Sequence, residues 1–170
     1  MNQGLDQKLC EKYPKIFAMR NGKPSETNMC WGFQCDDGWY DLIDSMCAMI
    51  QHHINWREQQ HDYDIQWNAN PDNQPREVMQ PVEQVVATQV KEKFGGLRFY
   101  YRGGDEYIRG MVDFAEQFSC RICEVTGDRG ELHIDSGVIK TLSPKLIETD
   151  ERYRLGWRPY REWREEQNKG

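Results

Sequence analysis

The sequence lacks any long apolar run. Its longest apolar stretches fall well short of the roughly 20 consecutive apolar residues that a membrane-spanning helix needs. The opening residues, MNQGLDQKLCEKYPKIF, also lack the apolar segment and the small-residue cleavage site of a secretory signal peptide. The sequence therefore predicts an intracellular protein without a membrane segment.

Signatures of catalysis are missing as well. The chain has no H-E-x-x-H and no G-x-S-x-G, and its glycines form neither the G-x-x-x-x-G-K-[ST] nor the G-x-G-x-x-G phosphate loop. A cysteine–histidine nucleophile pair would leave no local pattern because its members are distant in sequence, and no feature points to one. We therefore expect a protein that is not an enzyme.

The chain has fewer basic than acidic residues. The 22 Lys and Arg residues are outnumbered by 28 Asp and Glu, which gives a formal net charge of -6. A net negative charge disfavours nonspecific electrostatic binding to nucleic acid or to an anionic membrane, although it is compatible with a local basic patch. Nucleic acid is therefore not an expected partner on overall charge.

The six cysteines supply only half of a recognisable zinc site. Cys120 and Cys123 form a C-x2-C pair, whereas a structural zinc ion takes four ligands. The only other pair with acceptable spacing is Cys30 and Cys35, in the distant stretch CWGFQC. We expect no metal or other cofactor, and a zinc site built from Cys30, Cys35, Cys120 and Cys123 is the alternative.

Helical periodicity is clearest in two segments. Apolar residues recur at helical spacing over residues 36–56 and again over 104–119, where Phe118 belongs to the apolar stripe. Residues 57–81 are rich in Gln, Asn, Asp and Pro without any periodicity, which predicts an exposed polar insertion or loop. Trp67 in that segment is expected to pin the loop to its own protein, with a partner anchor as the alternative.

Residues 81–104 predict a β-hairpin. Branched valines precede a Gly95-Gly96 turn, and an alternating strand follows the turn. The alternation places Arg98, Tyr100 and Arg102 on one face, and the lysines alternate likewise on the first strand. Such a face is usually a solvated surface with ordinary cross-strand pairs, but it also suits stacking of a base and binding of phosphates. The candidate ligand residues are Lys91, Lys93, Arg98, Tyr100 and Arg102.

The end of the chain is charged and aromatic. A short strand and then a turn or helix at Pro144 are expected before a tail over residues 147–170. Trp157, Tyr160 and Trp163 lie three residues apart there, which predicts a helical aromatic stripe that packs back on the protein or docks on a partner.

Three blocks of sequence, GFQCDDGWYDLI, QVKEKFGGLRFYYRG and CEVTGDRGEL, resemble a family of small, uncharacterised bacteriophage proteins. Those proteins combine a GDGW helix start with a VKEKFGGLRFY strand pair and a zinc-knuckle-like module of the form C-x2-C-G…T-L-C-x2-H. Laid on that pattern, Cys123 takes the first ligand position, but Thr126, Ser143 and Leu146 take the others, and none of these three is a usable zinc donor. The resemblance implies a phage origin and a degenerate, metal-free knuckle held by packing.

The predicted fold is α+β, with a small antiparallel sheet or hairpin packed on two main helices. We expect one domain over residues 1–146, including the insertion at 57–81 and the degenerate knuckle at 119–146, followed by the tail at 147–170.

The leading functional hypothesis is a non-catalytic phage accessory protein that acts in the host cytoplasm. It would bind a host protein and inhibit or divert it, as in counter-defence. One alternative is a sponge for a nucleotide immune messenger on the hairpin face, completed across a homo-oligomer, and another is a zinc-binding or nucleic-acid-binding module. Aromatic side chains dominate protein interfaces, so the candidate partner anchors are Trp31, Trp67, Trp157, Tyr160 and Trp163.

Overall fold

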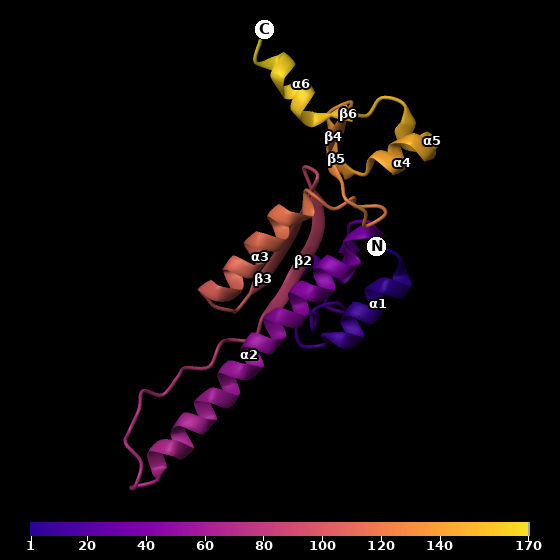
Figure 1. The fold of residues 1–170 in the computed structure, drawn as a ribbon. Helices are drawn as coiled ribbons and strands as arrows, with labels where there is room; N and C mark the ends of the chain where they lie inside the picture. Colours follow the sequence, from indigo (N-terminus) through magenta and orange to yellow (C-terminus); the bar gives the residue numbers. More distant parts are fainter. Residues whose placement is uncertain (170) are drawn as a thin grey trace.

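The computed structural model describes residues 1–169, and its helices and small sheets confirm the predicted α+β class. Two units are distinguished by their cores: the body, residues 1–122, and the C-terminal module, residues 123–169. Figure 1 shows the module at one end of the body and the long helix α2 (Tyr40–Ala69) projecting past the other end. The body also contains α1 (Gln3–Lys12), two 3-10 helices (Met29–Trp31 and Asp37–Trp39), β1 (Phe33–Gln34), β2 (Val86–Lys93), β3 (Gly96–Arg102) and α3 (Glu106–Ser119).

A three-stranded sheet in the order β1–β2–β3 organises the body, with β1 parallel and β3 antiparallel to β2. The predicted hairpin is present, but its turn lies one residue earlier than expected. Phe94 and Gly95 occupy the turn with φ values of 56° and 78°, which is the positive-φ pair that a tight hairpin needs. The core forms where the alternating apolar residues of the strands meet the apolar stripe of α2, and it includes Trp39, Ile43 and Phe99.

The prediction of a loop over residues 57–81 is wrong for residues 57–69, because these residues continue the helix α2. Most residues of this stretch are good or tolerable helix formers, and the chain meets no proline before Pro71. Periodicity missed the helix because hydrophobic spacing reports a buried face, and the last apolar core residue of α2 is Ile54. Beyond Ile54 the helix and the returning chain form an arm, residues 57–81, and the chain rejoins the body core at Val82 and Val85 (Figure 1).

Polar contacts hold the arm together. Asp64 is buried against the returning chain, where it pairs with Arg76 at 2.9 Å and accepts a hydrogen bond from the Met79 amide at 3.1 Å. The Trp67 indole donates to the Gln74 carbonyl at 2.9 Å, and the Arg76 guanidinium lies 4.6 Å from its ring centroid. Trp67 therefore packs on its own arm, as the pin hypothesis expects.

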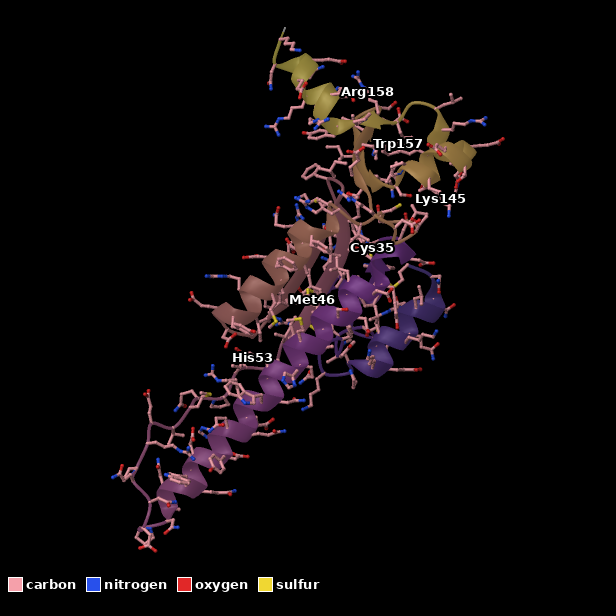
Figure 2. All side chains as sticks on the ribbon, in the orientation of Figure 1. Cys35, Met46, His53, Lys145, Trp157 and Arg158 are labelled. Atoms are coloured by element: carbon pink, nitrogen blue, oxygen red, sulfur yellow. The ribbon has the colours of Figure 1, made fainter. Side chains whose placement is uncertain are left out.

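The C-terminal module contains a second antiparallel sheet in the order β5–β4–β6, of which the sequence predicted only β5. The expected boundary at residue 146 falls inside α4, and the predicted tail contributes β6 to this sheet. Trp157, labelled in Figure 2, packs against the small core formed by Cys123, Leu142 and Leu146. The elements of the module are β4 (Glu131–Asp135), β5 (Val138–Leu142), α4 (Pro144–Thr149), α5 (Glu151–Arg154), β6 (Arg158–Pro159) and α6 (Tyr160–Gln167).

The three sequence blocks of the phage resemblance meet where the body joins the module. The Gly38 amide donates to the Glu124 carbonyl at 2.8 Å, and a β-carbon on Gly38 would collide with the backbone of Cys123 and Gly127. The hairpin turn reaches the same region, since the Thr141 hydroxyl donates to the Gly95 carbonyl at 2.6 Å. Gly38 and Gly95 of these motifs therefore pack against the module at this junction.

A buried charge pair lies in this junction. The Glu124 side chain is 2% exposed and receives the Lys140 ammonium at 3.0 Å, while the Asp36 carboxylate lies 3.2 Å from the same ammonium. Burial raises the pKa of Glu124, and the hydrogen bond from Lys140 opposes that shift. Burial alone would lower the pKa of Lys140, but its carboxylate partners outweigh burial and raise it.

Candidate ligand-binding cleft

A cleft of about 1460 Å³ opens between the body and the C-terminal module. One wall comes from the end of α3 and the turn that follows it, another from the start of β4, and a third from α6. Pockets for drug-sized molecules have volumes of about 300–1,000 Å³, so this cleft has room for an extended ligand. We call it the arginine cleft.

Four arginines and a single acidic residue line the arginine cleft. The acid is Glu131. Within residues 1–169, none of the four guanidinium groups forms an ion pair with a carboxylate. The cleft is thus locally basic in a chain with a formal net charge of -6. The four residues are Arg121, Arg129, Arg161 and Arg164.

Backbone pairing positions these arginines. The bridge between Ile122 and Arg129 closes the turn after α3, and the Gly130 amide donates to the Arg121 carbonyl at 2.9 Å. Arg161 and Arg164 lie three residues apart on α6, so they project from neighbouring positions on one face of that helix. Because β6 pairs with β4, α6 is held against the same strand whose start lines the cleft.

Aromatic rings border the arginine cleft on two walls. Phe118, at the end of α3, is 42% exposed and stacks on Phe114 with ring centroids 5.5 Å apart. Its exposure corrects the expectation that Phe118 belongs to the buried stripe of this helix. Tyr160 lines the α6 wall and stacks on Trp163 at 5.5 Å. The cleft therefore combines planar cations with aromatic surface.

The five hairpin candidates, Lys91, Lys93, Arg98, Tyr100 and Arg102, share one sheet face, which we call the basic sheet face. Lys91 lies opposite Arg98 and its ammonium is 5.6 Å from the Tyr100 ring centroid. Tyr100 is 41% exposed. Arg98 lies 3.7 Å from Glu116 of α3, so this face is partly neutralised.

The basic sheet face adjoins the arginine cleft at Gly96. A β-carbon on Gly96 would lie 3.1 Å from the Cys120 sulfur and 3.1 Å from an Arg98 guanidinium nitrogen. Cys120 itself lines the cleft. Arg98 therefore lies beside the cleft wall at Cys120, and the basic sheet face begins next to the arginine cleft.

The predicted aromatic anchors lie in separate places. Trp31 is 65% exposed on a 3-10 helix of the body, and Trp67 lies on the arm. Trp157 packs on the module core, while Tyr160 and Trp163 lie on α6. Only Tyr160 among them lines the arginine cleft.

The four candidate cysteine ligands do not gather into a metal site. Within residues 1–169, no group of three or more His, Cys, Asp or Glu side chains has an arrangement that could hold a metal ion. Burial raises the pKa of Cys35 to about 12, so its thiol stays protonated. Cys123 is fully buried in the module core.

The degenerate knuckle positions have other contacts. The Ser143 hydroxyl caps α4 by accepting from the Leu146 amide at 3.2 Å, and the Thr126 hydroxyl accepts from the Asp128 amide at 3.3 Å. Leu146 joins Cys123 in the module core. A turn contact, a helix cap and apolar packing thus involve the three positions at which the predicted resemblance expects metal ligands.

Searches of protein-family models, of curated proteins and of solved structures found no match to this chain. The resemblance to bacteriophage proteins therefore stays a prediction from sequence. In the part of the chain that the structure describes, no helix combines the length and the apolar character that crossing a membrane requires.

Sequence reasoning missed the four arginines of the cleft. They occur in mixed-charge stretches such as YREWREEQ, where each arginine has acidic neighbours. The spacing of Arg161 and Arg164 was the available signal, because residues three apart share a helix face. Their convergence with Arg121 and Arg129 depends on the pairing of β6 with β4, which the sequence did not predict.

Proposed function

We propose that this protein is a non-catalytic binding protein that holds an anionic ligand in the arginine cleft. The observation that carries the proposal is the convergence of Arg121, Arg129, Arg161 and Arg164 on one cleft without carboxylate partners among the described residues. Unpaired cations at a single concave surface repel one another, and an anion relieves that repulsion.

The use of arginine for the basic residues of the cleft supports ligand binding rather than catalysis. Arginine stays protonated at physiological pH and offers a planar fork of donors that matches phosphate and carboxylate groups. A guanidinium that never gives up its proton is a poor general acid or base. Four arginines in one cleft therefore favour holding a ligand over transforming it.

The phage resemblance supports a role in the host cytoplasm, where the bound ligand would be withheld from host machinery. Under this proposal the inhibition or diversion of a host component takes the form of ligand capture. The nucleotide-sponge alternative gains support from the same arginines, with its site moved from the hairpin to the adjoining cleft.

Binding of long-chain inorganic polyphosphate tests the proposal, because this probe offers anionic groups and nothing else. We expect saturable binding in isothermal titration calorimetry. The double variant Arg121→Gln/Arg164→Gln, which removes one cation from each of two walls, weakens the affinity about tenfold or more.

The matched control is Lys8→Gln/Arg154→Gln, which changes the net charge equally at exposed positions outside the cleft. It leaves the affinity within about twofold, because neither residue lines the cleft and salt screens exposed charges that do not contact the ligand. Equal weakening by both double variants would assign binding to overall charge and overturn the proposal, as would the absence of saturable binding.

A further inference from the structure

We infer that the ligand is a single strand of nucleic acid that runs through the arginine cleft and past Cys120 and Arg98 onto the basic sheet face. This assignment rests on the proposed function, because it names the class of anion that the arginines hold. It adds two features of the molecule that a bare anion would not use: the aromatic rings and the proximity of the two basic surfaces.

The first argument is the extent of the basic region. The arginine cleft alone has a volume of about 1460 Å³, and Arg98 of the basic sheet face lies near Cys120 on its wall. A single nucleotide or a small anion fills only part of such a surface. A flexible polyanion with regularly spaced charges matches a row of cations along its whole length.

The second argument is the distribution of aromatic rings along this region. Phe118 lies on the α3 wall, Tyr160 on the α6 wall, and Tyr100 on the sheet face. Phe118 and Tyr100 keep 42% and 41% of their surface exposed, so a base can reach their rings. Proteins that bind single strands combine a positive groove with aromatic side chains on which successive bases stack.

The third argument is the form of the cations. Every basic residue that lines the cleft is an arginine, and a guanidinium both grips phosphate in a bidentate manner and stacks on a base. A segment of Asp and Glu residues offers carboxylates to the arginines but no ring that could stack on the three aromatic side chains. The rings therefore favour nucleic acid over an acidic peptide.

The overall charge of -6 is compatible with this assignment. Screening confines electrostatic effects to about 8–10 Å at physiological ionic strength, so the local excess of cations decides whether a strand is attracted. The acidic surface outside the basic region repels phosphates, which limits where a strand can bind and disfavours nonspecific binding.

The experiment compares three labelled probes by fluorescence anisotropy: oligothymidylate and oligouridylate of about 12 nucleotides, and an abasic strand with the same number of phosphates. We expect either base-bearing strand to bind about tenfold or more tightly than the abasic strand. A difference between the two base-bearing strands that persists when oligodeoxyuridylate replaces oligothymidylate distinguishes DNA from RNA as the source of the ligand.

Variants separate phosphate contacts from stacking. In Arg121→Gln/Arg164→Gln, the slope of log Kd against log salt concentration for oligothymidylate falls by about 1.4, from two lost phosphate contacts on a single strand. In Tyr100→Ala, binding of oligothymidylate weakens about tenfold while binding of the abasic strand is unchanged. Tyr107→Ala, an exposed tyrosine on α3 outside both surfaces, serves as control and leaves both affinities unchanged.

The outcomes distinguish this inference from the proposed function. Equal affinity for base-bearing and abasic strands, or no effect of Tyr100→Ala, overturns the nucleic-acid assignment. In that case, polyphosphate binding that depends on the arginines still upholds the proposed function. Tighter arginine-dependent binding of poly-glutamate than of either oligonucleotide assigns the cleft to an acidic protein segment instead. Melting temperatures within about 3 °C of the parent protein verify that each variant is folded.

Discussion

The body and the C-terminal module are stabilised in different ways. The body has an extended apolar core to which α1, α2, α3 and the first sheet all contribute. The module buries three apolar residues in its own core and depends on its junction with the body, where Glu124 and Lys140 form a buried pair. Because the arginine cleft takes walls from both units, ligand binding depends on a rigid body and on a module of much smaller core.

The largest effect is expected from a truncation in the body core. Ile43→Ala removes a fully buried side chain of α2 and should lower the free energy of unfolding by about 3–5 kcal/mol, from lost burial and the cavity left behind. Urea unfolding followed by circular dichroism measures it. Met49→Ala, at an exposed position of the same helix, is the control and costs less than about 0.5 kcal/mol. A loss below about 1 kcal/mol for Ile43→Ala would contradict the contrast between the units.

A somewhat smaller loss is expected from the junction. Lys140→Met leaves the buried carboxylate of Glu124 without its cation, which should cost about 3 kcal/mol at neutral pH. The double variant Glu124→Gln/Lys140→Met removes the stranded charge and should regain more than half of that loss. If the double variant is as unstable as Lys140→Met, the cost lies in packing and the charge pair is not what joins the units.

The loss in Lys140→Met should depend on pH in a defined direction. Burial already raises the pKa of Glu124 above its ordinary value of 4.5, and removing Lys140 raises it further. A carboxyl group with a raised pKa in the folded state binds its proton more tightly there, so folding is favoured at low pH. The destabilisation should vanish below pH 4.5 and grow as the pH rises toward the folded-state pKa. Urea titrations of variant and parent across this range measure it.

Elements with a buried face were predictable from the sequence. The apolar stripe of α2 up to Ile54 and the alternation in β2 and β3 each report burial against the core. The outer half of α2 was not predictable in this way, because its helix is held by polar contacts such as the Asp64–Arg76 pair. Periodicity carries no information about such a helix.

The cleft was less predictable than the fold. Tyr100 and its neighbours on the basic sheet face followed from strand alternation alone. Arg121 and Arg164 line the same cleft because β6 pairs with β4, and β6 consists of only two residues, Arg158 and Pro159. A strand this short leaves no hydrophobic pattern, so its place in the sheet is settled by tertiary packing.

A third prediction addresses the module core. Leu146→Ala should cost about 2 kcal/mol, at the lower end for a buried leucine because the small cluster with Cys123 and Leu142 can relax around the gap. Amide hydrogen exchange should show the loss of protection in β4 and β5 but not in α2 and β3, as expected when one unit opens locally. Uniform loss of protection across both units would mean that body and module unfold as one, and the comparison between them would fail.

The smallest effect is expected in the body but away from its core. Asp105 caps α3 by accepting from the Ile108 amide at 3.0 Å and also contacts His53 of α2 at 2.9 Å. Asp105→Ala removes both contacts and a 3.6 Å contact with Arg57, and it should cost about 1 kcal/mol, whereas Asp105→Asn retains a capping oxygen and should cost less. Differential scanning calorimetry of the two variants at neutral pH measures the difference.

The sign of the pH dependence at Asp105 separates its charge from its cap. Burial alone would raise the pKa of Asp105, but hydrogen bonds from His53 and from the Ile108 amide outweigh it and hold this pKa below the ordinary value of 3.8. A carboxylate with a lowered pKa contributes stability above that ordinary value and loses it as the pH falls through the folded-state pKa. The gap between parent and Asp105→Asn should therefore close in acid. A gap that persists below the folded-state pKa would show that packing, and not charge, stabilises this edge of the body.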